Sequence, residues 1–236
     1  MTRSELQRRL ADVEERIAAA CARAGRARES VRLVAVTKTV SEQVTAMLPE
    51  LGLFDLGESR PQVLARKAEA LKQYPIRWHL IGHLQRNKVD ASLPLVALLH
   101  SVDSMRLLQE VARWGRQQSR PCPILLQVNA SREEQKGGWS YEELLASFDT
   151  IQQIEGVQIE GLMGMAAFSD DPESARPTFR ELRQFRDQIQ PRWQRGPLDQ
   201  LSMGMSGDYE VAIEEGSTLI RLGSTLFEEL PENQLS

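Results

Sequence analysis

The sequence predicts an α/β fold: a single-domain (β/α)8 TIM barrel with an additional N-terminal helix. The chain has 236 residues, a length that suits one large barrel better than two full domains. Eight short apolar segments alternate with helical segments, as parallel βαβ units require. No Pro-, Gly- or Ser-rich linker interrupts this alternation. We therefore expect one domain over residues 1–236, with the N-terminal helix over 1–25 and the barrel over 31–230.

The first 25 residues have the pattern of an amphipathic helix. Apolar side chains recur at alternating spacings of four and three residues from Leu6 to Ala20, which places them on one helix face. Thr2 and Glu5 have the spacing of a capping box, and Gly25 is a stop signal. This segment precedes the first predicted strand.

The alternation of strands and helices continues along the rest of the chain. The predicted strands are residues 31–37, 53–56, 76–81, 95–102, 123–129, 157–163, 198–203 and 218–223. The predicted helices between them are residues 41–50, 61–73, 85–91, 104–118, 140–154, 172–190 and 206–215. An open, doubly wound sheet is the alternative. It would normally have fewer strands and often a Gly-rich first turn, but the first strand here ends in Thr37-Lys38-Thr39 without a nucleotide-binding motif.

Composition excludes several classes of protein. The 29 Lys and Arg residues against 33 Asp and Glu residues give a net charge of −4, without the basic excess of a nucleic-acid-binding protein. The longest stretch free of charged residues, 91–102, is too short to span a membrane. Cys21 and Cys122 form no CxxC pair, so we expect neither a disulfide framework nor a zinc site, and a reducing cytoplasm.

Lys38 is a candidate functional residue because it directly follows the first predicted strand. Side chains in this position of a barrel point into the site at the carboxyl ends of the strands. The apolar run before Lys38 would desolvate its amine and favour the neutral, nucleophilic form. Such a lysine can form a Schiff base with an aldehyde. The alternative is a solubilising lysine at a strand exit.

The segment Leu201-Ser-Met-Gly-Met-Ser-Gly-Asp208 is a candidate phosphate site. Ser206 is the expected N-cap of the following helix, and Gly204 and Gly207 allow a ligand to approach the backbone N–H groups closely. Barrels commonly bind phosphate after the seventh and eighth strands, where Ser206 and the turn 222–224 fall. The alternative is an ordinary capped helix.

The two histidines of Trp78-His79-Leu-Ile-Gly82-His83 are four residues apart, a spacing that pairs metal ligands only on a helix. His79 lies in a predicted strand and His83 follows Gly82. We therefore interpret both as packed or hydrogen-bonded histidines and expect no metal site.

Several longer strings carry a resemblance to a known family. They are Val36-Thr-Lys38, Gly57-Glu58, Trp78-His-x-Ile-Gly-x-Leu-Gln-x-Asn-Lys88, His100-Ser-Val-Asp103, Gly161-Leu-Met163, Ser202-Met-Gly-Met-Ser-x-Asp208 and Ala212-Ile-x-x-Gly-Ser-Thr-x-x-Arg-x-Gly223. Over nearly its whole length the chain resembles the pyridoxal phosphate homeostasis protein family. The resemblance implies a barrel similar to the N-terminal domain of alanine racemase, holding pyridoxal 5′-phosphate (PLP) on a lysine.

The resemblance also implies roles for individual residues. Lys38 would be the Schiff-base lysine, and Arg221 would face the pyridine nitrogen. The residues expected to cradle the phosphate are Ser206, Gly207, Gly223 and Ser224. Met163 and Met203 would border the ring. The family motif Gly-Glu-Asn reads Gly57-Glu58-Ser59 here, so a contact from Ser59 would replace the usual amide with a hydroxyl.

These roles imply a binding protein rather than an efficient enzyme. Racemisation needs an acid and a base on opposite faces of the substrate, and in alanine racemase the second group is a tyrosine from another subunit's extra domain. The chain has only Tyr74, Tyr141 and Tyr209 and, on our interpretation, no such domain. We expect a cytoplasmic monomer that serves PLP homeostasis and amino-acid and keto-acid balance. The alternatives are a PLP-dependent amino-acid racemase of low or specialised activity and a regulatory protein that acts through partner proteins.

Overall fold

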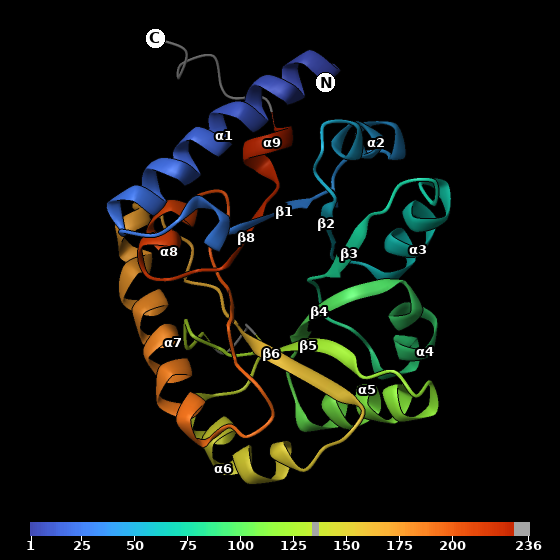
Figure 1. Ribbon diagram of the computed structural model, residues 1–236, viewed down its shortest axis with the longest axis vertical. Coiled ribbons are helices and arrows are strands. Elements are labelled where there is room, and N and C mark those ends of the chain that lie inside the picture. The colour runs from blue at the N-terminus through green and yellow to red at the C-terminus, as the bar shows by residue number, and fades with distance from the viewer. Residues whose placement is uncertain (134–136, 229–236) are drawn as a thin grey trace.

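Eight parallel strands close into a barrel in the order in which they occur along the chain, which confirms the predicted fold (Figure 1). The computed structural model describes residues 1–133 and 137–228, so the end of the expected barrel, residues 229 and 230, lies outside the described residues. Each strand pairs with the next, and β8 (Leu219–Leu222) pairs with β1 (Arg32–Val36) in parallel. A closed barrel has no exposed sheet edge.

The strands alternate with helices that surround the barrel (Figure 1). The remaining strands are β2 (Asp55–Glu58), β3 (Arg77–Leu80), β4 (Val96–Val102), β5 (Cys122–Gln127), β6 (Val157–Met163) and β7 (Gln200–Ser202). The helices are α1 (Arg3–Arg23), α2 (Glu42–Glu50), α3 (Pro61–Ala70), α4 (Val89–Ser92), α5 (Met105–Gln117), α6 (Tyr141–Gln152), α7 (Arg176–Ile189), α8 (Tyr209–Glu214) and α9 (Ser224–Phe227).

Most predicted elements begin or end one to a few residues away from the predicted positions, and two of these differences have a clear structural cause. The second strand was expected at 53–56 but begins at Asp55, because pairing of Ala35 with Leu56 and of Val36 with Gly57 sets its register. The helix expected at 206–215 begins only at Tyr209. The residues before it form a turn that is held by contacts with the loop after β8, a long-range interaction that local sequence signals do not encode.

Helix α1 is an integral part of the fold. Its capping box forms as predicted, with the side chain of Thr2 accepting from the backbone of Glu5 and the side chain of Glu5 accepting from the backbone of Thr2. Leu6 and Ile17 are fully buried, and the helix packs against α8 and α9 (Figure 1). It therefore covers the part of the barrel where the last strand returns to the first.

The apolar residues form two cores. Outward-facing strand residues pack beneath the helices in one large cluster. A second, small cluster fills part of the barrel interior and consists of Val34, Leu98, Leu125, Met163 and Leu219. Successive strand residues point to opposite faces, and the interior also holds buried polar side chains, which are described below.

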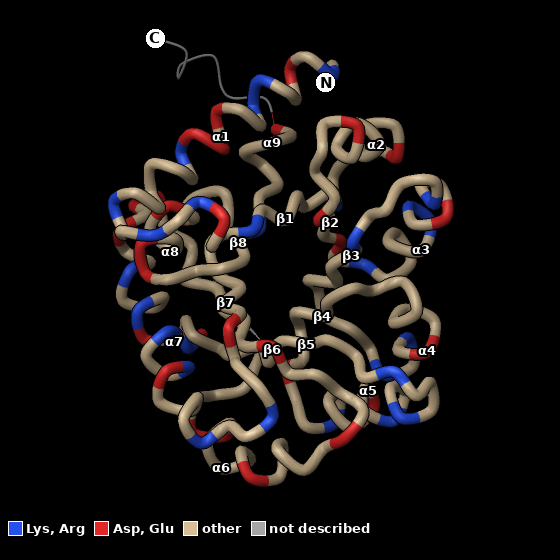
Figure 2. Tube along the Cα trace, in the orientation of Figure 1, with Lys and Arg blue, Asp and Glu red and all other residues tan. Residues whose placement is uncertain are grey.

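The surface has the mixed charge of the composition. Lys and Arg residues are interspersed with Asp and Glu residues along the outer helices (Figure 2). None of the helices in the described ranges is both long enough and apolar enough to cross a membrane. Cys21 and Cys122 are buried and unpaired.

We expect Ile17→Ala to lower the free energy of unfolding by about 2–5 kcal/mol, because it leaves a cavity between α1 and the barrel. Glu15→Ala, on the exposed face of the same helix, should change it by less than about 0.5 kcal/mol. Chemical denaturation measures both values. Equal stability of the two variants would show that α1 is not part of the cooperative unit.

Candidate functional site

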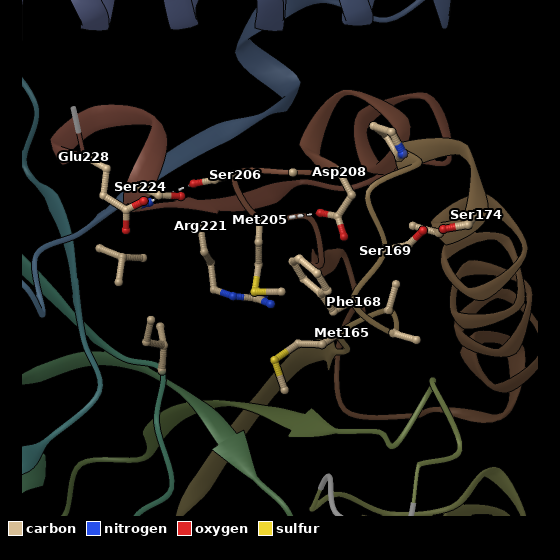
Figure 3. Close-up of a pocket in the computed structure, with 18 of the residues that line it drawn as sticks. Met165, Phe168, Ser169, Ser174, Met205, Ser206, Asp208, Arg221, Ser224 and Glu228 are labelled. Carbon is tan, nitrogen blue, oxygen red and sulfur yellow. Dashed lines mark hydrogen bonds between the residues drawn. The ribbon is translucent and has the colours of Figure 1, made fainter. Parts of the chain in front are cut away.

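A cavity of about 440 Å³ lies at the carboxyl ends of the strands, the end of a barrel that carries the site in characterised enzymes. Its lining includes Val36 at the end of β1, Ile81 after β3, Met165 after β6 and Met205 after β7. The volume lies within the range of small-molecule sites. Figure 3 shows Arg221, Met165 and Met205 among the side chains that line this cavity.

Lys38 lines the cavity from the turn after β1. The sequence predicted an amine that is desolvated by apolar neighbours, and this expectation is wrong for the structure, because Lys38 is exposed. The apolar residues before it, Leu33 to Val36, are buried in the strand, but the chain leaves the strand at Thr37. The amine is thus accessible to both ligand and water.

A buried ion pair lies beneath the Lys38 turn. Lys67 Nζ of α3 donates to Glu58 Oε1 and to the carbonyl oxygen of Thr37, both at 2.6 Å. The Thr37 hydroxyl donates to the same Glu58 oxygen at 2.7 Å. Lys67 and Glu58 are fully buried. Since Thr37 directly precedes Lys38, these bonds fix the backbone from which the Lys38 side chain departs.

The loops after β7 and β8 meet at Ser206. Its hydroxyl oxygen accepts from the backbone N–H groups of Gly223 (3.3 Å) and Thr225 (3.2 Å). The predicted role of Ser206 as a helix N-cap is therefore wrong, because α8 begins three residues later and Asp208 holds the cap position. Ser206, Gly207, Gly223 and Ser224 nevertheless all line the cavity.

Gly204 allows the close turn between β7 and this loop. Its φ angle of +94° lies in the left-handed region that favours glycine. A Cβ atom here would lie 2.6 Å from the Cβ of Ala212, so a larger residue would push α8 away from the strand. The carboxylate of Asp208 then closes the turn by accepting from the Met205 backbone N–H at 2.6 Å.

Arg221 is a buried cation at the base of the cavity. Its Nη1 donates to Ser202 Oγ at 2.5 Å and its Nη2 to the Gly164 carbonyl oxygen at 3.3 Å. Burial lowers the pKa of Arg221 to about 10, with partial compensation from Asp208. The guanidinium stays charged at neutral pH, and its five N–H donors leave capacity for an acceptor bound in the cavity.

The structure brings six of the nine predicted site residues together. Lys38, Ser206, Gly207, Arg221, Gly223 and Ser224 all line the cavity. Ser59, Met163 and Met203 are not among the lining residues. Met163 belongs to the apolar cluster inside the barrel and Met203 to the cluster beneath the helices, so contact of these residues with a ligand stays a prediction.

Phe168, which the sequence did not single out, lines the cavity together with Met165 and Met205. Each residue lies beyond the end of its strand, so strand periodicity does not predict whether its side chain points toward the cavity. Phe168 is 93% exposed at the cavity rim.

The two histidines singled out by the sequence have separate surroundings. His79 is buried inside the barrel, whereas His83 is exposed and its Nδ1 lies 2.8 Å from Asp103 Oδ2. Within the described part of the chain, no group of three or more His, Cys, Asp or Glu residues is arranged to hold a metal ion.

The comparisons with known proteins decide the family. The sequence model of the family described as "Alanine racemase, N-terminal domain" matches residues 9–231. The chain belongs to this family. A "Pyridoxal phosphate homeostasis protein" of Aquifex aeolicus (strain VF5) is 41% identical over 221 residues, which cover 94% of this chain and 96% of the relative. The family resemblance inferred from the motifs is confirmed.

Solved structures extend the comparison. PipY of Synechococcus elongatus PCC7942, solved with PLP bound, superposes with a TM-score of 0.83 at 30% identity and covers 94% of this chain and 99% of PipY. An unknown protein from Bifidobacterium adolescentis gives a TM-score of 0.89 at 36% identity, with 95% of both chains covered. Alanine racemase of Clostridium difficile 630 is 13% identical with a TM-score of 0.75, and this likeness concerns the fold alone.

We expect Lys67→Met to lower the free energy of unfolding by about 3–5 kcal/mol, because it leaves the Glu58 carboxylate buried without its cation. The double variant Lys67→Met/Glu58→Gln should be more stable than Lys67→Met alone. Lys72→Met, at an exposed lysine, is the matched control and should stay within about 0.5 kcal/mol of the wild type. A wild-type denaturation midpoint for Lys67→Met would contradict the assignment.

Proposed function

We propose that this protein binds PLP reversibly as a Schiff base on Lys38 and serves intracellular PLP homeostasis and amino-acid and keto-acid balance, without efficient catalysis. One observation carries the proposal. The cavity combines an accessible amine, a buried guanidinium and a cradle of hydroxyl and backbone N–H groups, in a chain with 30% identity to a protein solved with PLP bound.

The donor groups of the cavity match the chemistry of PLP. When bound, PLP supplies an aldehyde that condenses with a primary amine, with release of water, and a pyridine ring that accepts electrons. Lys38 is the cavity-lining primary amine among the described residues. Ser206, Gly207 and Ser224 offer hydroxyl and N–H donors that suit a phosphate group, and Gly223, whose N–H donates to Ser206, lets the phosphate approach this turn without a side chain in the way.

Arg221 argues against strong carbanion chemistry. A guanidinium has only donors and remains charged, so a pyridine nitrogen opposite Arg221 accepts a hydrogen bond and stays unprotonated. The ring is then a weaker electron acceptor. The exposed position of Lys38 gives water access to the carbon–nitrogen double bond, which favours hydrolysis and release of the cofactor.

The tyrosines are placed away from the cavity. Tyr74 donates to Glu50 at the surface, whereas Tyr141 and Tyr209 are buried in the core. None of the three is among the residues that line the cavity within the described ranges. In this chain, a phenol is therefore not in place to act as the second acid or base of a racemase, which supports binding as the function.

The proposal includes the finer expectations drawn from the sequence. Residues 1–236 act as one domain, and Ser59, Met163 and Met203 contact PLP or its immediate surroundings once it is bound. The protein works as a cytoplasmic monomer, without nucleic-acid or membrane partners. The mixed surface charge (Figure 2) and the net charge of −4 support the absence of nucleic-acid binding.

Reconstitution with PLP tests the covalent attachment. We expect the purified protein to gain the visible absorbance of a Schiff base, to lose it on borohydride reduction, and to carry the added mass on the peptide that contains Lys38. Lys38→Ala should abolish all three signals. Lys72→Ala, at an exposed lysine outside the cavity, should retain them. A reduced adduct of equal yield in Lys38→Ala would overturn the assignment.

Incubation with single-enantiomer alanine tests the expectation of inefficient catalysis. At high protein concentration, we expect the PLP-loaded wild type to change optical purity no faster than free PLP does. Chiral chromatography over time measures the rate, with Lys38→Ala as the matched protein control. A rate that depends on Lys38 and clearly exceeds that of free PLP would instead establish an amino-acid racemase.

A further inference from the structure

A continuous line of polar side chains crosses the barrel interior and ends at Arg221. Asp55 Oδ1 lies 2.9 Å from His79 Nε2, and His79 Nδ1 lies 2.8 Å from His100 Nε2. His100 Nδ1 lies 2.8 Å from Ser202 Oγ, which accepts from Arg221 Nη1 at 2.5 Å. All five residues are buried. This hydrogen-bond chain of five side chains connects the amino end of β2 with the cavity at the carboxyl end of β8.

The carboxylate of Asp55 sets the direction of the first bond. Burial alone raises the pKa of Asp55, but hydrogen bonds from His79 and Arg77 outweigh this effect and lower the pKa to about 2. An ionised carboxylate only accepts hydrogen bonds. The proton between Asp55 and His79 must therefore be on His79 Nε2.

The remaining bonds follow from the chemistry of neutral imidazole, which has one donor and one acceptor nitrogen. Burial lowers the pKa of His79 and lowers that of His100 well below its ordinary value. With its proton on Nε2, His79 accepts at Nδ1, so His100 donates from Nε2. His100 then accepts at Nδ1, and the hydroxyl of Ser202 must be the donor.

The charged groups around both rings support their neutral form. His79 faces Asp55, Arg77 and Arg32, and His100 faces His79 and Arg221. Apart from Asp55, whose charge is already shared with Arg77, these neighbours are cationic or neutral. A positive charge on either ring would be repelled by the nearby arginines, and this repulsion is strong in an interior of low dielectric constant.

We propose that His100 and Ser202 are positioning residues for Arg221. Asp55 sets one direction for every hydrogen bond in the chain, and Ser202 therefore always presents an oxygen lone pair to the Arg221 guanidinium. With the Gly164 carbonyl oxygen on Nη2, this lone pair holds the plane of the guanidinium. The hydrogen-bond chain and its direction are properties of the ligand-free protein. Its effect on a bound pyridine ring rests on the proposed function.

Imidazole nitrogen-15 NMR on the ligand-free wild type tests the direction of the chain. The protein has only three histidines, and His83→Gln identifies the exposed one. We expect His79 and His100 both to be neutral at pH 7 with the proton on Nε2. A proton on Nδ1 of either ring, or a doubly protonated ring, would overturn the proposal, whether or not the protein binds PLP.

Asp55→Asn tests the origin of the direction, because it preserves shape and removes the charge. An amide can donate or accept, so we expect the two histidines to lose their single tautomeric form. If both rings keep the wild-type tautomer in folded Asp55→Asn protein, the carboxylate does not set the direction.

Ser202→Ala tests the connection to the cofactor. We expect PLP affinity to fall about tenfold or more, since a hydrogen bond to a charged group is lost at Arg221, and the visible band to shift, while borohydride still labels Lys38. Ser101→Ala, which removes another buried hydroxyl from β4 outside the chain, is the matched control. The proposal fails if both variants bind PLP with the same affinity and spectrum; absent binding by the wild type would instead refute the proposed function.

Discussion

The parallel register between β1 and β8 brings together two parts of the chain that are far apart in sequence, and the cavity depends on it. Arg32 pairs with Leu219 and Ala35 with Leu222, so the turn that carries Lys38 lies next to the strand that carries Arg221. A parallel pair at this seam is possible only because the six strands between them complete the barrel. Helix α1 packs over the helices that follow β7 and β8 and stabilises the seam from outside.

Two buried networks of polar side chains lie on opposite sides of the barrel wall. On its outer side, Glu58 and Lys67 pair beneath α3 and fix the backbone before Lys38. On its inner side, a chain of hydrogen bonds runs from Asp55 to Arg221. Each buried polar group costs free energy unless it has a partner. Lys38 and Arg221 are thus both oriented by interactions that are hidden from solvent and only weakly screened by salt.

Membership in the alanine racemase N-terminal domain family explains the fold without specifying a reaction, because function depends on the groups placed in a site rather than on the barrel. The cavity offers an amine and hydrogen-bond donors for an anionic ring compound. Lys38 is exposed at the rim of this cavity, and Arg221 is buried at its base.

The sequence pattern alone predicted the barrel, the capped N-terminal helix and the placement of Lys38 and Ser206 at the carboxyl ends of the strands, because strand and helix periodicities are local and parallel strands place their carboxyl ends together. Arg221 was assigned to the same site only through the resemblance to a known family. The sequence could not determine that Ser206 binds the loop after β8 rather than capping α8. Nor could it pair His79 with His100. These contacts depend on strand register and on the inward or outward direction of single side chains, which only closure of the barrel decides.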